Sequence, residues 1–172
     1  MTVNALTRRH GLNLGLLGLA GGLAALAWVE AARDRSPTIP PLLALTVEQI
    51  ERIAVERPEQ AGLTFERRDG RWWMTAPDSG PVNPVLIHPI VQLAEARCTP
   101  SYPVAELDLP RLQLDPPRLR LWLNGQEIHF GAIAPTDGQR YLRIGGTVHL
   151  CPDRWYPLLT SAAGSFLAKP LD

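Results

Sequence analysis

Two histidines on segments that we predict to be β-strands are the residues best suited to bind a metal ion. His129 and His149 lie on strands that we expect to be neighbours, and imidazole is a common zinc ligand. Their motifs lack the cysteine and carboxylate spacing of a zinc site. Single histidines on the outer face of a strand are usually exposed to solvent, so we expect no metal site and no cofactor.

A thiol nucleophile is the second candidate chemistry. Cys151 follows His149 by two positions, so both side chains would point to the same face of a strand. A nucleophilic cysteine also needs a group that orients its base and a donor for the oxyanion, and the sequence indicates neither. Asp108 and Asp115 stand in turn-rich stretches where aspartate caps the backbone. We therefore expect no catalytic residue and predict that the chain is not an enzyme.

The only two cysteines, Cys98 and Cys151, could instead bond to each other. A disulfide forms in an oxidising compartment, and closing a loop of this length would add about 4 kcal/mol of stability in the chain-entropy model. The bond also requires a short Cα–Cα distance, which the sequence does not give. Both the bonded state and two free thiols remain open.

Arginine and tryptophan side chains share one face of a predicted hairpin. Arg68, Arg71 and Trp73 could bind an anionic polymer or a partner protein, although such a face is more often a solvated sheet surface. The formal net charge of the chain is +0. Nucleic-acid-binding proteins usually carry a basic excess, so we expect no nucleic-acid partner.

The first 45 residues differ from the rest of the chain in composition. Residues 11–29 carry no charge, and a helix of this length would extend about 28 Å, close to the thickness of a bilayer's hydrocarbon core. Arg8 and Arg9 precede this segment, and positive flanks stay in the cytoplasm. We therefore predict a single-pass inner-membrane protein with a cytoplasmic N-terminus (1–10), a transmembrane helix (11–29), a linker (30–45) and a periplasmic domain (46–172).

Two other export signals fit the same residues. Ala25-Leu26-Ala27 matches a cleavage pattern, which would make the segment a cleaved signal peptide. Thr7-Arg8-Arg9 resembles a twin-arginine signal. Whether the helix is retained stays open, but every alternative places the domain outside the cytoplasm.

Small residues repeat along the predicted transmembrane helix with a 4-3-4-3 spacing that brings them to one face. Such a stripe lets another helix approach closely, although glycine and alanine are also simply common in membrane helices. The stripe could therefore be a packing face for another helix or could only reflect how common these residues are, and both interpretations stay open. The stripe consists of Gly11, Gly15, Gly18, Gly22 and Ala25.

The domain itself is rich in hairpin signals. Asp69-Gly70 and Asn124-Gly125 are two-residue loops between alternating apolar and polar residues, a pattern typical of antiparallel hairpins. Gly145-Gly146 indicates a third hairpin whose alternation is poorer, so we expect both of its faces to be partly covered. The alternation places one apolar set toward a core: Leu63, Phe65, Trp72, Met74, Leu119, Leu121, Leu123, Ile128 and Phe130. Residues 52–56 are expected to add a strand beside the first hairpin.

Helical segments follow the first and third hairpins. One is predicted over residues 88–97, or from Pro84 with a kink at Pro89. Another begins at Trp155. The predicted fold class is therefore α+β: an N-terminal transmembrane helix followed by antiparallel β-hairpins, with a few short helices packed on the sheet.

From about Ile50 onward, the chain resembles the bacterial "domain of unknown function 4340" family. The resemblance rests on an ordered set of motifs: Ile53-Ala54-Val55-Glu56, Leu63-Thr64-Phe65-Glu66-Arg67 through Trp73 to Pro77, Leu114-Asp115-Pro116-Pro117, Phe130-Gly131 and Tyr141-Leu142-Arg143. Where that family often has Tyr-Gly, this chain has Leu112-Gln113, which argues against a tight turn because Gln tolerates positive φ poorly.

The resemblance implies an accessory envelope role beside gliding-type ABC transporter components. We therefore expect a membrane-anchored extracytoplasmic interaction protein whose partners are the membrane and membrane-protein subunits such as an ABC transporter. The alternatives are a module that binds an envelope glycan or lipid, and, less favoured by the residues, a periplasmic hydrolase.

Overall fold

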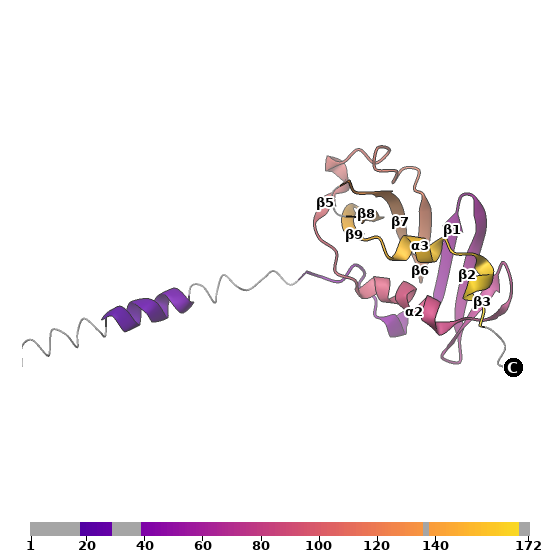
Figure 1. The fold of residues 1–172 in the computed structure, drawn as a ribbon, viewed down its shortest axis with the longest axis horizontal. Coiled ribbons are helices and arrows are strands. Elements are labelled where there is room, and N and C mark those ends of the chain that lie inside the picture. The colour runs from indigo at the N-terminus through magenta and orange to yellow at the C-terminus, as the bar shows by residue number, and fades with distance from the viewer. Residues whose placement is uncertain (1–17, 29–38, 136–137, 169–172) are drawn as a thin grey trace, which may run out of the picture. The chain divides into compact units, whose positions relative to one another are not determined.

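The structure is a computed structural model that describes residues 18–28, 39–135 and 138–168. The chain divides into two compact units, Met1–Thr38 and Ile39–Asp172. The second unit contains the predicted hairpins, and Figure 1 shows its strands together with the short helices that lie against them.

Nine strands of the described residues form one antiparallel sheet in the order β4-β3-β2-β1-β6-β7-β8-β9-β5. Strand β1 pairs with both β2 and β6, which joins the first and second hairpins into a continuous sheet. The strands are β1 (Arg52–Arg57), β2 (Gln60–Arg68), β3 (Arg71–Ala76), β4 (Gly80–Pro81), β5 (Ser101–Pro103), β6 (Leu119–Leu123), β7 (Gln126–Ile133), β8 (Gln139–Ile144) and β9 (Thr147–Pro152).

The helices among the described residues of this unit are short. They are the α-helices α2 (Pro84–Gln92) and α3 (Trp155–Leu159) and the 3₁₀ turns η1 (Val47–Gln49), η2 (Leu93–Glu95), η3 (Val104–Glu106) and η4 (Ala163–Phe166). Helix α2 begins at Pro84, the alternative start, because the Asn83 side chain accepts a bond from the Val85 amide at 3.0 Å. The Trp155 indole donates to the Pro89 carbonyl at 2.9 Å and so ties α3 to α2.

All three predicted hairpins are confirmed. Asp69 and Gly70 have φ values of 50° and 77°, and Asn124 and Gly125 have 47° and 85°. Positive φ at both central residues is the geometry of a type I′ turn. Pairing of Arg68 with Arg71 fixes the register of the first hairpin.

The apolar face predicted from the alternation is the buried face. Leu63, Phe65 and Met74 are at most 1% exposed, and Trp72 is half-buried against the same core. Helices α2 and α3 lie on this face of the sheet (Figure 1). The largest fully buried side chains include Trp155, Phe65, Phe130, Phe166, Ile50 and Ile53.

The compact unit begins earlier than the predicted boundary at residue 46. Leu42 and Leu43 are 8% and 4% exposed. Their amides donate to the carbonyls of Ala96 and Ala94 at 2.8 and 2.9 Å. Residues 42 and 43, predicted to be linker, therefore pack into the domain core.

The fold class predicted from the sequence is wrong. The described residues form mainly the nine-stranded antiparallel sheet, with only a few short helices, rather than an α+β domain behind a transmembrane helix. Nor does any helix in this part of the chain combine the length and the apolar character that crossing a membrane requires. Within the predicted span 11–29, the described helix covers residues 18–28.

Three members of the small-residue stripe lie on helix 18–28. Gly18, Gly22 and Ala25 are exposed, and a methyl group added to Gly18 or Gly22 would meet no atom within 4 Å. Gly11 and Gly15 lie outside the described residues. The stripe therefore stays a prediction.

Candidate functional site

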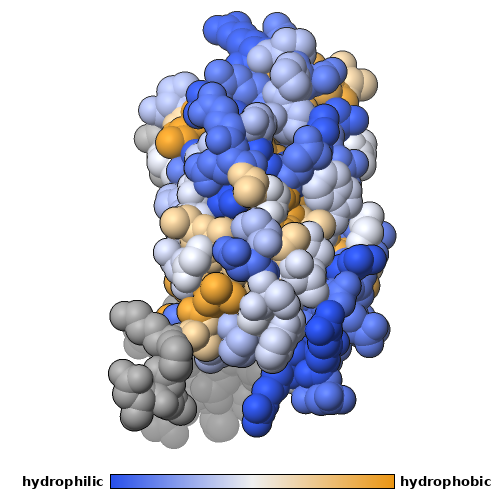
Figure 2. Space-filling model, turned by 90° about the vertical axis from the view of Figure 1, so that its right-hand side faces the viewer, coloured by the Kyte–Doolittle hydropathy of each residue, from blue (hydrophilic) through white to orange (hydrophobic). Residues whose placement is uncertain are grey.

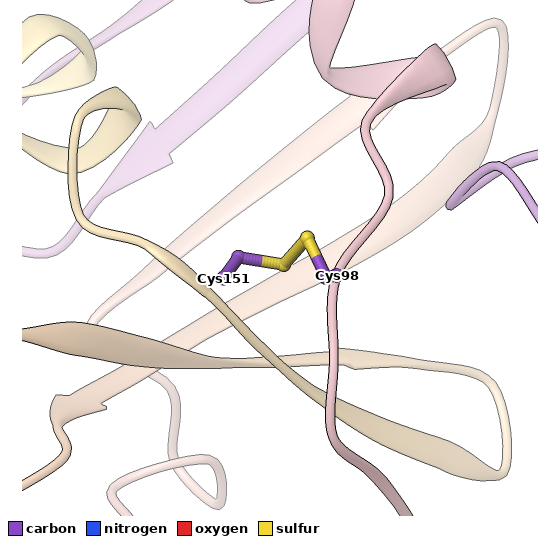
Figure 3. The surroundings of a disulfide bond; sticks show 2 residues. All are labelled: Cys98 and Cys151. Atoms are coloured by element: carbon purple, nitrogen blue, oxygen red, sulfur yellow. A yellow bond between two sulfur atoms is a disulfide. The ribbon is translucent and has the colours of Figure 1, made fainter. Parts of the chain in front are cut away.

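Cys98 and Cys151 form a disulfide with an S–S distance of 2.09 Å and a Cα–Cα distance of 4.9 Å. Figure 3 shows the bond linking the segment after η2 to strand β9. The cysteines are 5% and 0% exposed. Beside them, the Leu150 amide donates to the Pro100 carbonyl at 3.0 Å. The bond, which the sequence left open, thus fastens the crossover to β5 onto the core of the sheet.

The two candidate metal ligands are not brought together. Strand β8 lies between the strands that carry them. His129 pairs with Arg143, whereas His149 pairs with the preceding residue, Leu142. Because successive residues of a strand point to opposite faces, the two histidines lie on opposite faces of the sheet. Within the described ranges, no group of three His, Cys, Asp or Glu side chains is placed to hold a metal ion.

The candidate thiol nucleophile and the candidate aspartates also have structural partners. Cys151 is bonded to Cys98, so its sulfur is no thiol partner for His149. The Asp108 carboxylate accepts a bond from the Arg111 amide at 3.2 Å, as expected for an aspartate that caps the backbone. Burial lowers the pKa of His149 below its ordinary value.

The predicted arginine–tryptophan face is crossed by ion pairs. Glu66 lies 3.3 Å from Arg52 and 3.1 Å from Arg68. These pairs offset part of the positive charge that Arg68 and Arg71 would offer to an anionic polymer. Figure 2 shows one face of the molecule on which hydrophilic residues predominate and hydrophobic ones form small, separate patches.

A cavity of about 400 Å³ lies where three segments meet: the β1–β2 turn, the start of β6 and helix α3. We call it the arginine pocket. It is lined by Arg57, Pro58, Glu59, Gln60, Arg118, Leu119, Tyr156 and Thr160. Sequence reasoning missed it because its polar side chains come from distant parts of the chain.

Arg57 is a buried cation whose hydrogen bonds go only to neutral groups. It is 6% exposed. Its Nε donates to the Ala61 carbonyl at 2.9 Å, its Nη2 donates to the same oxygen, and its Nη1 donates to the Ser161 carbonyl at 2.8 Å. No carboxylate of the described residues forms an ion pair with it. Burial of this charge lowers the pKa of Arg57.

Arg118 is held by a residue with an unusual backbone conformation. Gln113 has a φ of 55°. The tight turn therefore forms, although the sequence argued against it because Gln tolerates positive φ poorly. Its amide oxygen accepts a bond from Arg118 Nε. A non-glycine residue in this region costs about 1 kcal/mol or more and often marks a functional constraint. Here the turn presents a side chain that orients an arginine of the pocket.

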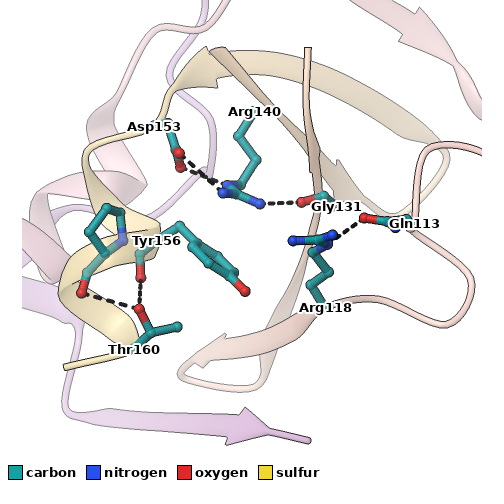
Figure 4. Close-up of polar contacts among 8 residues, drawn as sticks. Gln113, Arg118, Gly131, Arg140, Asp153, Tyr156 and Thr160 are labelled. Atoms are coloured by element: carbon teal, nitrogen blue, oxygen red, sulfur yellow. Dashed lines mark hydrogen bonds and ion pairs between the residues drawn. The ribbon is translucent and has the colours of Figure 1, made fainter. Parts of the chain in front are cut away.

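Tyr156 is oriented from behind by a third arginine (Figure 4). Arg140, 2% exposed, binds both Asp153 oxygens at 2.6 and 3.1 Å and donates to the Gly131 carbonyl. Its guanidinium carbon lies 3.6 Å from the centroid of the Tyr156 ring. A bidentate pair with a stacked ring is a rigid arrangement, so Arg140 acts as a positioning residue for Tyr156.

Two of these arginines could have been found from the sequence, because they occupy core-facing positions of their strands. Arg57 continues the buried alternation of Ile53 and Val55 along β1, and Arg140 precedes the buried Leu142 by two positions on β8. A charge at a core-facing position is rare unless it has a partner or a role.

No family model, curated protein or solved structure matches this chain. The resemblance to the "domain of unknown function 4340" family therefore remains a prediction that rests on the motifs alone.

Proposed function

We propose that this chain is an accessory protein of the cell envelope whose compact unit works outside the cytoplasm by binding rather than by catalysis. The observation that carries this proposal is the disulfide between Cys98 and Cys151. Disulfides persist in oxidising compartments and are rare in the cytosol.

The edges of the sheet support a role in which side chains, not strand pairing, make the contacts. The edge strands β4 and β5 have two and three residues, and each contains a proline, Pro81 and Pro103. Short edges with proline resist the addition of a foreign strand. We therefore expect a partner to bind surface side chains. The class of partner, a transporter component at the inner membrane, follows from the motif resemblance alone.

Export is tested with the full chain fused at its C-terminus to alkaline phosphatase, which is active only outside the cytoplasm. We expect an active fusion. Alkylation without reductant, followed by mass spectrometry, should find no free thiol at Cys98 or Cys151. An inactive but intact fusion, or two alkylated cysteines, would contradict the proposed location.

Partner binding is tested by extracting the full chain in mild detergent and identifying the proteins that copurify. We expect an inner-membrane protein complex in the eluate. Chemical crosslinking before extraction is the control for partners lost in detergent. A chain that emerges alone from both preparations would contradict the accessory role without affecting the location.

A further inference from the structure

We propose that the arginine pocket binds the phosphate group of a small ligand or of a headgroup. This inference goes beyond the proposed function and does not depend on it, because it concerns the chemistry of one cavity and not the partner or the compartment.

The charges around the cavity favour an anion. Arg57 uses three of its five N–H groups on carbonyls. Among the guanidinium nitrogens of Arg118, only Nε has a protein acceptor within the described residues, the Gln113 side chain. Of the residues that line the pocket, Glu59 alone is acidic, and it is exposed. A buried cation without a counter-ion is costly, and an anionic ligand would supply the missing charge.

Arg57 and Tyr156 are held in place before any ligand arrives, and Arg118 is oriented by one side-chain bond. Carbonyls of Ala61 and Ser161 hold Arg57, Gln113 holds Arg118, and Arg140 holds the ring of Tyr156. The cost of ordering these side chains has therefore been met during folding, which improves affinity. The left-handed backbone conformation of Gln113 costs free energy locally, and its role in orienting Arg118 explains why the fold tolerates that cost.

Phosphate fits this donor set better than a carboxylate does. Its oxygens can accept bonds from several directions and it carries nearly two negative charges, and two arginines from different segments approach the cavity. Planar guanidinium groups bind phosphate oxygens in pairs. At about 400 Å³ the cavity has the size of a small-molecule site, so an organic part would accompany the phosphate, against Pro58, Leu119 and the Tyr156 ring.

The test is calorimetric titration of the full chain in an uncharged detergent with sodium phosphate and with O-phosphoethanolamine, at constant ionic strength. We expect saturable binding of at least one of them. Arg118→Gln should weaken it about tenfold or more, the usual worth of a hydrogen bond to a charged group. Arg71→Gln, an exposed arginine of β3 outside the pocket, is the matched control and should bind as the natural chain does.

Two further variants protect the test against misfolding. Arg118 is exposed, so its replacement should leave the melting temperature unchanged. Tyr156→Phe keeps the ring on Arg140 and removes the hydroxyl, and should weaken binding a few-fold. Arg57→Gln, measured below its own melting temperature, should also weaken binding. The proposal would be overturned if neither the soluble phosphates nor vesicles that contain phosphatidic acid bind saturably, or if Arg118→Gln and the natural chain bind with equal affinity.

The source of the phosphate is distinguished by a second arm with vesicles of phosphatidylcholine, with or without phosphatidic acid. Binding that depends on Arg118 and on phosphatidic acid identifies a headgroup ligand, whereas binding only of the soluble phosphates identifies a free one. Either result supports the pocket. Sodium acetate and succinate are the carboxylate arm; if they bind as tightly as phosphate and with the same dependence on Arg118, the phosphate assignment is overturned.

Discussion

At the scale of single residues, close contacts decide which positions tolerate change. Gly131 lies in β7, where the register shifts between Phe130 and Ile133. A Cβ at this position would lie 2.5 Å from the Leu112 carbonyl oxygen and 2.9 Å from Leu114. The same glycine's carbonyl accepts a bond from Arg140. The Gly131 backbone thus supports both the loop that carries Gln113 and the arginine that orients Tyr156.

We expect Gly131→Ala to lower the free energy of unfolding by about 1–3 kcal/mol, because backbone must move to admit the methyl group. Gly146 is the matched control, since a Cβ there would meet nothing within 4 Å, and Gly146→Ala should stay within about 0.5 kcal/mol. Urea unfolding of both variants measures the difference. Equal stabilities would show that the loop shifts easily.

His149 should make stability depend on pH. Burial lowers its pKa, so below about pH 6.5, the ordinary value, the unfolded chain takes up a proton that the folded chain resists. Stability should therefore fall as the pH drops from 7 toward 5. His149→Gln should flatten this part of the profile, measured by urea unfolding at several pH values. His88→Gln, at an exposed position of α2, is the control; if both variants change the slope equally, burial of His149 is not the cause.

At the scale of elements, one hairpin turn does more than reverse the chain. The Asn124 side-chain oxygen accepts the amides of Glu51 and Arg52 at 2.9 and 3.0 Å, and its amide nitrogen donates to the Gln49 carbonyl. The β6–β7 turn is thereby pinned to the start of β1. Asp69 occupies the same position in the β2–β3 turn, with a similar φ of 50°.

This pair of turns gives a matched comparison. Asn124→Ala and Asp69→Ala both place alanine at positive φ, but only the first removes bonds to another element. We expect Asn124→Ala to cost about 1–2 kcal/mol more in free energy of unfolding, measured by denaturant titration. Equal losses would mean that water replaces the lost acceptor at no cost.

At the scale of the whole molecule, the disulfide joins parts that are separated by 53 residues. In the chain-entropy model such a loop contributes about 4 kcal/mol. The double variant Cys98→Ala/Cys151→Ala should therefore lose roughly 2–5 kcal/mol of stability, as should the natural chain in reductant. Reductant should leave the double variant unchanged, which is the control. A natural chain that melts at the same temperature with and without reductant would contradict this contribution.

The sequence by itself determined the local structure. Two-residue loops with Gly specified all three hairpins, and alternating side chains also specified the register and the buried face of the first two, because turn geometry and the period of two act over a few residues. The sequence left two possible starts for α2, residue 88 or Pro84, and the Asn83 cap places the start at Pro84.

Only the tertiary structure decided how these pieces combine. Pairing of β1 with β6, the bond between Cys98 and Cys151, and the meeting of Arg57, Arg118 and Tyr156 all join residues far apart in the chain. No local propensity encodes such contacts, since they form when separate apolar faces are buried against one another. Gln113 also adopts its positive φ although its residue type argued against the turn, and the neighbouring Leu112 carbonyl accepts the Ala132 amide of β7 at 2.8 Å, which ties this loop to the sheet.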